Sequence, residues 1–147
     1  MSDLSLMIDG IKLNIRVGII FKYNNSVLIE MPRVKGGNSV IPGGRVKIDE
    51  LCFDAIKREI KEEMHFTLKD EKIVFRKNLE SFFEINNVKF HEFFFVYEYM
   101  MDDMDYQRLK LIKENMDNHA SYYIFANFND LEKVNLLPLE VREIIRN

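Results

Sequence analysis

The sequence predicts a single α/β (α+β) domain in which helices cover a β-sheet. Its 147 residues are enough to bury one sizeable hydrophobic core. Segments rich in β-branched and aromatic residues lie on both sides of one strongly periodic helix, expected at residues 50–65. The run 93–97 is apolar at every position, which is typical of a central strand covered on both faces by helices.

The first third of the chain is predicted to form strands and tight turns. Strands are expected at 4–8 and 11–23, because the Asp-Gly pair between them supplies the positive φ angles of a type I′ hairpin turn. A further strand is expected at 26–31, where a proline ends the run. A glycine-containing loop follows at 33–39, and the Pro-Gly-Gly sequence at 42–44 predicts a turn.

The helix at 50–65 is the clearest element of the sequence. Asp49 is the expected N-cap, because an aspartate side chain can accept a hydrogen bond from a free amide of the first turn. The apolar positions follow a helical period and are Cys52, Phe53, Ile56, Ile60 and Met64. One face of this helix is therefore expected to pack on the sheet.

The remaining elements are three strands and two helices. Strands are predicted at 72–85 and 88–101 around an Asn-Asn turn, and a last strand at 121–128. The charged stretch between them predicts a loop with a helix over 106–114. A proline opens a short amphipathic helix at 139–146, which ends the domain.

Composition and charge narrow the class of protein. With 21 basic and 24 acidic residues the net charge is -3, and no long run of Lys or Arg is present, so a nucleic-acid polymer is not expected as a partner. The single cysteine, Cys52, excludes an intramolecular disulfide and predicts a reducing compartment, with the cytoplasm as the default location. The N-terminal residues mix charges into their apolar positions, which predicts neither a signal peptide nor a membrane helix.

Three carboxylates gather on one turn of the predicted helix. At the helical angle of about 100° per residue, Glu62 and Glu63 lie about 60° and about 40° to either side of Glu59. One interpretation is that they are ordinary solvated acids of a helix surface. Such like-charge neighbours cost a few tenths of a kcal/mol per pair, however, and a bound divalent cation would convert this repulsion into coordination. The pattern therefore favours a site for a hard cation that binds phosphates.

The preceding loop adds a second indication of a ligand. Gly43 and Gly44 follow a proline and carry no Cβ, so their backbone can approach a ligand closely. A Pro-Gly-Gly sequence alone is more often a simple turn. Its fixed distance from the acidic residues makes a shared site the better interpretation.

Residues 44–66 resemble the sequence box of the Nudix hydrolases. The resemblance rests on the spacing Gly-x5-Glu-x7-Arg-Glu-x-x-Glu-Glu, which is met by Gly44, Glu50, Arg58, Glu59, Glu62 and Glu63. The resemblance implies a Nudix-type α/β/α sandwich, with a mixed β-sheet flanked by helices, over a single domain at 1–147. One position departs from the box, because His65 stands where the family usually has glycine in a left-handed conformation.

The resemblance also implies roles for the residues of the box. Glu59, Glu62, Glu63 and the carbonyl of Gly43 would bind Mg²⁺ or Mn²⁺, and either Glu62 or Glu63 would act as the base. Arg58 would orient Glu59 by a charge-assisted hydrogen bond, and Glu50 would be a helper ligand or an anchor for the loop. Weaker candidates are Gly44 and the cations Arg33 and Lys35 for substrate phosphates, and Glu114 as a further acid.

The implied activity is metal-dependent cleavage of the diphosphate linkage of a nucleoside diphosphate derivative. Nucleoside triphosphates, nucleotide sugars and the ADP-ribose class all fit, and neither a monomer nor a homodimer is excluded. Two alternatives stay open: a non-catalytic nucleotide-binding or regulatory module with the same fold, and an isomerase of prenyl diphosphates, which would use a cysteine in its active site. The complete acidic set and the position of Cys52 inside the helix favour the hydrolase.

Overall fold

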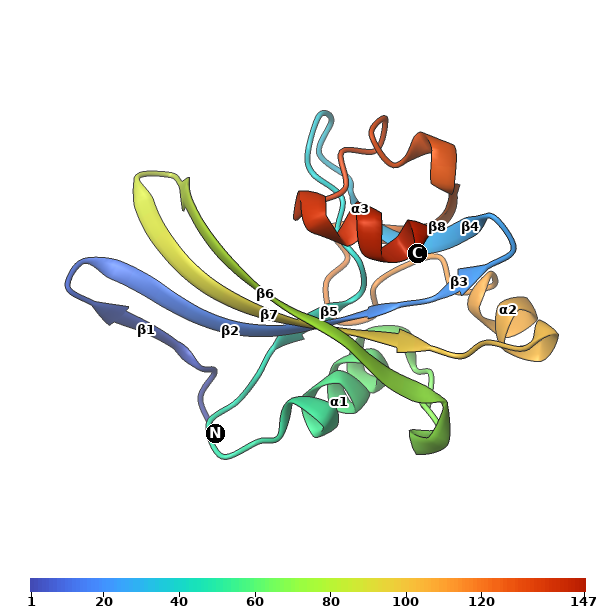
Figure 1. The fold of residues 1–147 in the computed structure, drawn as a ribbon, viewed down its shortest axis with the longest axis horizontal. Coiled ribbons are helices and arrows are strands. Elements are labelled where there is room, and N and C mark those ends of the chain that lie inside the picture. The colour runs from blue at the N-terminus through green and yellow to red at the C-terminus, as the bar shows by residue number, and fades with distance from the viewer.

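The computed structural model describes residues 1–147 as two β-sheets with three helices around them (Figure 1). The elements are β1 (Ser5–Ile8), β2 (Ile11–Ile20), β3 (Lys22–Tyr23), β4 (Ser26–Pro32), β5 (Gly43–Arg45), α1 (Cys52–Met64), β6 (Ile73–Ile85), β7 (Val88–Tyr99), α2 (Asp103–Leu109), β8 (Ser121–Asn127) and α3 (Leu139–Arg146). None of these helices is long and apolar enough to cross a membrane.

The main sheet has the strand order β1-β2-β7-β6, and β5 also pairs with β2. Strands β2 and β7 run parallel, whereas β1–β2, β2–β5 and β6–β7 are antiparallel, so the sheet is mixed. The β1–β2 hairpin turns at Asp9 and Gly10, both at positive φ, as the sequence predicts. Strands β3, β4 and β8 form the second sheet, in which β4 and β8 are antiparallel.

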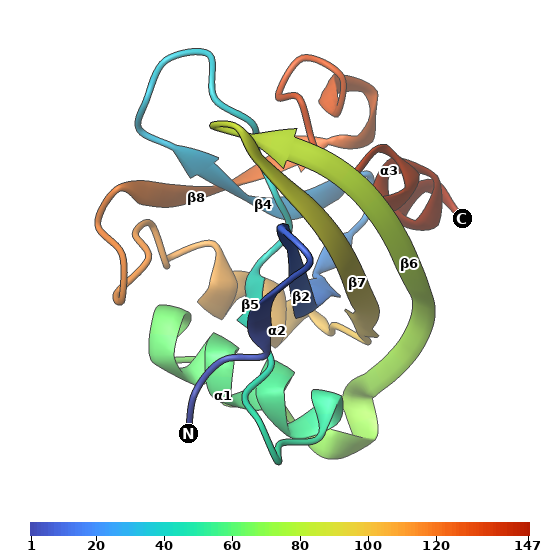
Figure 2. The same cartoon turned by 90° about the vertical axis from the view of Figure 1, so that its left-hand side faces the viewer.

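Helices α1 and α3 lie on opposite sides of the main sheet (Figures 1 and 2). On the α1 side, Ile56 and Ile60 pack in one buried cluster with Val17 and Tyr97 of the sheet. On the other side, α3 joins a second cluster that contains Val96. Strand β7 is therefore covered on both faces along its inner half, and the prediction of a helix-flanked mixed sheet is confirmed.

Two predictions for the first third of the chain are wrong. The strand expected at 11–23 breaks after Ile20, and its last two residues pair with β4 in the second sheet. The turn expected at 42–44 is instead the start of strand β5, in which Gly43 pairs with Gly18 so closely that a Cβ would fall 2.0 Å from the Val17 carbonyl oxygen. The glycines thus allow close strand pairing.

The starts of two helices also differ from expectation. Helix α1 begins at Cys52 with Leu51 as N-cap and no side-chain cap, because Asp49 takes a left-handed conformation at φ 67°. Helix α2 spans Asp103–Leu109 and not 106–114, since Asp102 forms a capping box with Asp105 and fixes the earlier start.

His65 ends α1 in the left-handed conformation that the family box normally assigns to glycine. Its φ is 52° and its ψ is 32°, and its backbone N–H donates to the Lys61 carbonyl oxygen at 3.1 Å. A residue with a Cβ pays about 1 kcal/mol or somewhat more for this conformation. The helix exit keeps its shape despite the substitution.

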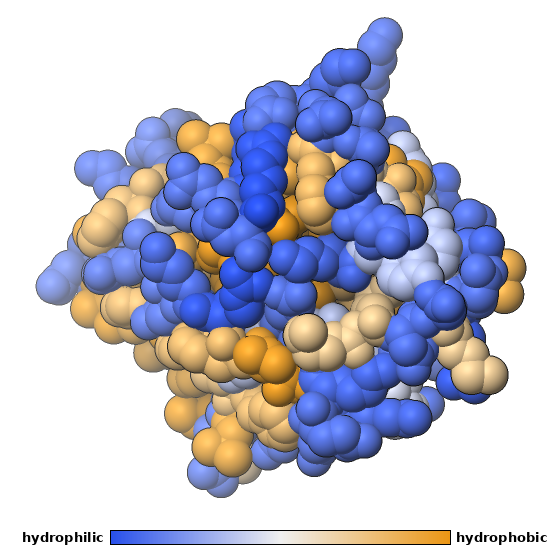
Figure 3. All heavy atoms as spheres, turned by 45° about the vertical axis from the view of Figure 1, so that its right-hand side comes forward, coloured by the Kyte–Doolittle hydropathy of each residue, from blue (hydrophilic) through white to orange (hydrophobic).

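Figure 3 presents the face of the molecule toward the α2 side, where hydrophilic side chains predominate and hydrophobic ones form small groups among them. Such a mixture is normal for a solvent-facing protein surface and does not by itself indicate a binding site.

Candidate active site on helix α1

The three acids of α1 differ in exposure because they border the buried stripe of the helix. Ala55, Ile56 and Ile60 are fully buried against the sheet. The side chain of Glu62 is 43% exposed, that of Glu59 is 14% exposed, and the whole of Glu63 is only 6% exposed. The helix therefore presents acids that range from solvated to buried along one edge.

Arg58 connects most of the predicted site residues. Its guanidinium donates two hydrogen bonds to the Glu50 carboxylate at 2.7 and 3.0 Å, one to Glu59 at 2.8 Å and a longer one to Glu62 at 3.3 Å. It also donates to the carbonyl oxygen of Arg45 at 3.0 Å, which ties the helix to β5. The hydrogen bond from Arg58 lowers the pKa of Glu50, whose carboxylate also accepts from the Lys47 amide. This geometry fits Glu50 as an anchor and Arg58 as the group that orients Glu59.

Gly44 lies directly against Glu59. A Cβ at position 44 would fall 2.3 Å from both Cδ and Oε2 of Glu59. Strand β5 therefore passes over the carboxylate so closely that a Cβ at position 44 would displace the end of the Glu59 side chain. Gly43, Gly44, Glu59 and Glu63 line the same cleft.

We expect Gly44→Ala to lower activity by about tenfold or more with little change in melting temperature. The added methyl group would push the flexible end of Glu59 away from Arg58, whereas the non-positive φ of Gly44 suits alanine. Steady-state kinetics and thermal unfolding of the same preparations test this. An unchanged kcat would show that the contact between Gly44 and Glu59 is unimportant for turnover.

Glu63 is held by a loop that the sequence analysis did not identify. The Asn115 side-chain amide donates to Glu63 Oε2 at 3.0 Å, and the Met116 backbone N–H donates to the Glu63 carbonyl oxygen at 2.7 Å. The same Asn115 amide approaches Oε2 of Glu30 at 3.3 Å, and Ser121 Oγ donates to that oxygen at 2.6 Å. The loop before β8 thus links a carboxylate of β4 with one of α1.

The carboxylates of Glu30, Glu59 and Glu63 repel one another in this poorly solvated region. Burial, a hydrogen bond with Glu59 and the negative charge of Glu30 together raise the pKa of Glu63 well above its ordinary value. Oxygen donors of this kind suit Mg²⁺ or Mn²⁺, and a cation would relieve the repulsion. Glu30 could have been noticed in the sequence, because it is the only charged residue of the strand predicted at 26–31. No feature of the sequence pointed to Asn115 as a site residue.

No three acidic, histidine or cysteine side chains are grouped as a ready metal site. Arg58 accounts for part of this, because it holds Glu59 and contacts Glu62, and both carboxylates point toward the guanidinium. Direct coordination by all three acids of α1 therefore requires Glu62, the most exposed of them, to rotate away from Arg58.

Of the weaker candidates, Gly44 lines the cleft, whereas Arg33, Lys35 and Glu114 lie outside it. Arg33 pairs with Glu114 at 2.5 Å and packs over the ring of Tyr122 at 5.4 Å from its centroid. Arg33 and Glu114 line a separate hollow of about 580 Å³, and Lys35 is exposed on the preceding loop. In this structure Arg33 and Glu114 form an ion pair with each other, and neither contacts Glu59 or Glu63.

The cleft beside the acids has a volume of about 1080 Å³ and extends along the main sheet. It runs from Glu59 and Glu63 over the strands β2, β7 and β6, and its lining includes both polar and aromatic side chains. A cleft of this size accommodates a ligand as large as a nucleotide.

Comparison with protein families identifies the domain. A family model described as the NUDIX domain matches residues 12–145, which is nearly the whole chain. The chain belongs to the Nudix family. The match confirms the resemblance seen in residues 44–66. No curated protein sequence matches the chain.

Solved structures of Nudix proteins share this fold. A MutT protein from Bacillus halodurans has a TM-score of 0.64 at 14% identity, over 91% of this chain and 80% of that one. A MutT protein from Methanosarcina mazei has a TM-score of 0.59 at 19% identity, over 95% and 94%. An Ap4A hydrolase from C. elegans has a TM-score of 0.57 at 17% identity, over 90% and 93%. At these identities the likeness establishes the fold.

Family membership confirms the prediction of a Nudix hydrolase that acts on pyrophosphate bonds. The structure brings Glu50, Arg58, Glu59 and Glu62 into one hydrogen-bonded group and places Glu63 beside it.

Proposed function

We propose that this Nudix hydrolase uses Mg²⁺ or Mn²⁺ to cleave the diphosphate linkage of a nucleoside diphosphate derivative. The observation that carries the proposal is that Glu59, Glu63 and Glu30 all line one nucleotide-sized cleft, beside the backbone of Gly43 and Gly44. Nucleoside triphosphates, nucleotide sugars and the ADP-ribose class are the candidate substrates. The Ap4A hydrolase among the similar structures supports a nucleotide substrate.

Each residue of the site has a separate task in this proposal. The cation would be held by Glu59, Glu63 and the Gly43 carbonyl. Glu62 would join them once its side chain rotates away from Arg58. A bound divalent ion supplies positive charge to the substrate phosphates and lowers the pKa of bound water. Arg58 keeps Glu59 in place, and Glu50 keeps Arg58 in place. Either Glu62 or Glu63 would accept the proton of the attacking water.

The loop residue Asn115 would act on Glu63 and not on the substrate. Its amide donates to Oε2 of Glu63, which fixes the orientation of that carboxylate. A carboxylate fixed by such a hydrogen bond presents one defined oxygen to a cation or a proton.

The position of Cys52 argues against an isomerase of prenyl diphosphates. Cys52 packs against the buried cluster beneath α1 and does not line the cleft that contains Glu59 and Glu63. Burial raises the pKa of its thiol, which disfavours the reactive thiolate. A lone, partly buried thiol also agrees with the proposed cytoplasmic location.

Incubation with a panel of nucleotides tests the proposal. The protein would be mixed with triphosphates, nucleotide sugars, ADP-ribose and Ap4A, with Mg²⁺ and with EDTA. We expect metal-dependent release of phosphate, pyrophosphate or nucleoside monophosphate from at least one compound. Absence of release from all of them, together with calorimetric binding of one, would favour the non-catalytic nucleotide-binding module instead.

A further inference from the structure

The face of the main sheet that forms the floor of the cleft carries a row of polar side chains. In the register, Asn14 of β2 and Ser81 of β6 both lie opposite Glu92 of β7, so the three side chains point to the same face. All three line the cleft that contains Glu59 and Glu63. A ligand whose phosphates meet the acids of α1 would therefore extend over this row.

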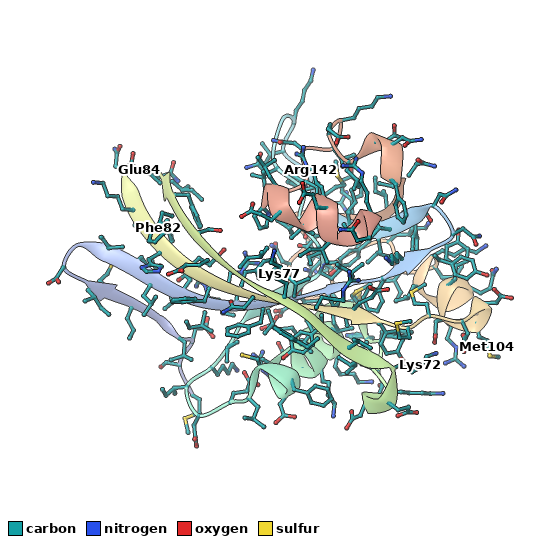
Figure 4. The ribbon with its side chains drawn as sticks, viewed as in Figure 1. Lys72, Lys77, Phe82, Glu84, Met104 and Arg142 are labelled. Atoms are coloured by element: carbon teal, nitrogen blue, oxygen red, sulfur yellow. The ribbon has the colours of Figure 1, made fainter.

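Aromatic side chains lie on both sides of the polar row. Toward the hairpin tip, Phe83 and Phe90 are paired and their rings stack with centroids 5.0 Å apart. Toward the inner end, the guanidinium of Arg16 lies 5.6 Å from the ring centroid of Phe94. The tip of the β6–β7 hairpin reaches beyond α1 and α3 (Figure 4), whereas Phe94 at the inner end is buried in the cluster that contains α3. Flat π-faces next to polar groups are the elements that bind a nucleobase.

Glu92 supplies the most directional group of the row. The residue is only 7% exposed, and its closest ion-pair contact is to Arg16 at 3.9 Å, which is long. Burial raises its pKa, and Arg16 and the Asn14 amide offset this only in part. Ser5 donates to the amide oxygen of Asn14 at 2.5 Å, so it is the Asn14 nitrogen that is available to the Glu92 carboxylate. The Glu92 carboxylate therefore has acceptor sites that these contacts do not use.

We propose that Glu92 reads the base of the substrate and that the base is guanine. A carboxylate only accepts hydrogen bonds, so it pairs best with two adjacent N–H donors, which guanine offers at N1 and N2. The neighbouring oxygen O6 of guanine is an acceptor, which suits the guanidinium of Arg16. This inference rests on the proposed function, because it places a nucleotide in the cleft of the same site.

The other bases match this arrangement less well. Adenine and cytosine present one amino donor beside a ring nitrogen that accepts, and this acceptor would face one oxygen of Glu92. Uracil presents a single N–H between two carbonyl oxygens. Each mismatch would leave a buried acceptor opposite another acceptor, which is strongly unfavourable. The chemistry of the row therefore selects among the bases and does not merely stack them.

Competition among substrates tests the proposal. We expect kcat/KM for guanosine triphosphates and guanosine diphosphate sugars to exceed that of the adenosine, cytidine and uridine counterparts by about tenfold or more. Glu92→Gln should lose this preference, because an amide presents one donor and one acceptor and so suits adenine or cytosine. The ratio of the guanosine to the adenosine rate should fall by about tenfold or more. Thermal unfolding of the variant checks that it folds.

Glu80→Gln is the matched control. Glu80 lies on β6 next to Ser81, but it pairs with Phe93 in the register and contacts His91, so its side chain is on the opposite face of the sheet from Ser81 and Glu92. The Glu80→Gln variant should keep the base preference of the parent. Equal rates for all four bases, a preference for another base, or an unchanged preference in Glu92→Gln would overturn the inference while the proposed function stands.

Equilibrium binding separates this inference from the hydrolase proposal. If no nucleotide is cleaved, calorimetry with GDP, ADP, CDP and UDP still measures the base preference of the cleft. Tighter binding of GDP that is lost in Glu92→Gln would support the guanine site. Equal affinities, or no binding of any of the four, would refute it.

Discussion

Glu63→Gln is expected to lower turnover by at least about a hundredfold and to raise the melting temperature in metal-free buffer. The loss of activity follows from removal of a charged ligand, since even partners that only position a ligand are worth about 10- to 100-fold. The gain in stability follows from the surroundings of Glu63, which is buried next to Glu59 and Glu30. A neutral amide of the same size removes that repulsion and keeps the packing.

The stabilisation by Glu63→Gln should depend on pH in a defined direction. The pKa of Glu63 is raised in the folded protein, so the folded state binds this proton more tightly than the unfolded chain does. Stability of the metal-free parent should therefore fall as the pH rises above the ordinary range of a glutamate, until the raised pKa is passed. Glu63→Gln does not lose stability in this way. The difference in melting temperature between the variant and the parent should therefore widen from pH 5 toward pH 8.

Thermal unfolding across this pH range, with kcat measured in Mg²⁺, provides the test. Glu140→Gln, an exposed acid of α3, is a suitable control and should change neither quantity. Parental activity in Glu63→Gln would remove Glu63 from the site. A lower melting temperature at every pH would show that the ionised carboxylate stabilises the fold.

Arg58→Gln is expected to lower both activity and stability. It removes two hydrogen bonds to Glu50 and one to Glu59, and it leaves the half-buried Glu50 carboxylate without its cation. We expect kcat to fall by about 10- to 100-fold, the range found when a group that orients a metal ligand is removed. The melting temperature should fall as well, because the pKa of Glu50 is lowered chiefly by Arg58.

Arg58→Lys distinguishes orientation from charge. A lysine keeps the positive charge but cannot make the planar, two-pronged contact with Glu50 while it also contacts Glu59. It should recover part of the stability and little of the activity. Full activity in Arg58→Lys would mean that charge alone is required, and that Arg58 does not set the direction of Glu59.

The parts of the fold that follow local rules could be predicted from the sequence. The Asp-Gly turn of the first hairpin, the apolar run of β7 and the proline that opens α3 each depend on neighbouring residues. The spacing of the acids on α1 predicted their common edge, because a helix fixes the angle between residues.

Features that depend on contacts between distant segments could not be predicted. Gly43 and Gly44 have low strand propensity, and only the pairing with β2 makes them part of β5. Asp49 is a favourable N-cap locally, but the hydrogen bonds of Glu50 to Arg58 and to the Lys47 amide shape the chain before α1 differently. Asn115 reaches Glu63 from 52 residues away in the chain.

Calorimetric titration of the metal-free protein with Mn²⁺ tests whether the acids of α1 form the metal site. We expect saturable binding by the parent and by Glu140→Gln, and an affinity at least about tenfold lower in both Glu59→Gln and Glu63→Gln. Equal affinity in all four proteins, or no binding by the parent, would contradict the assignment of the α1 acids as the metal site.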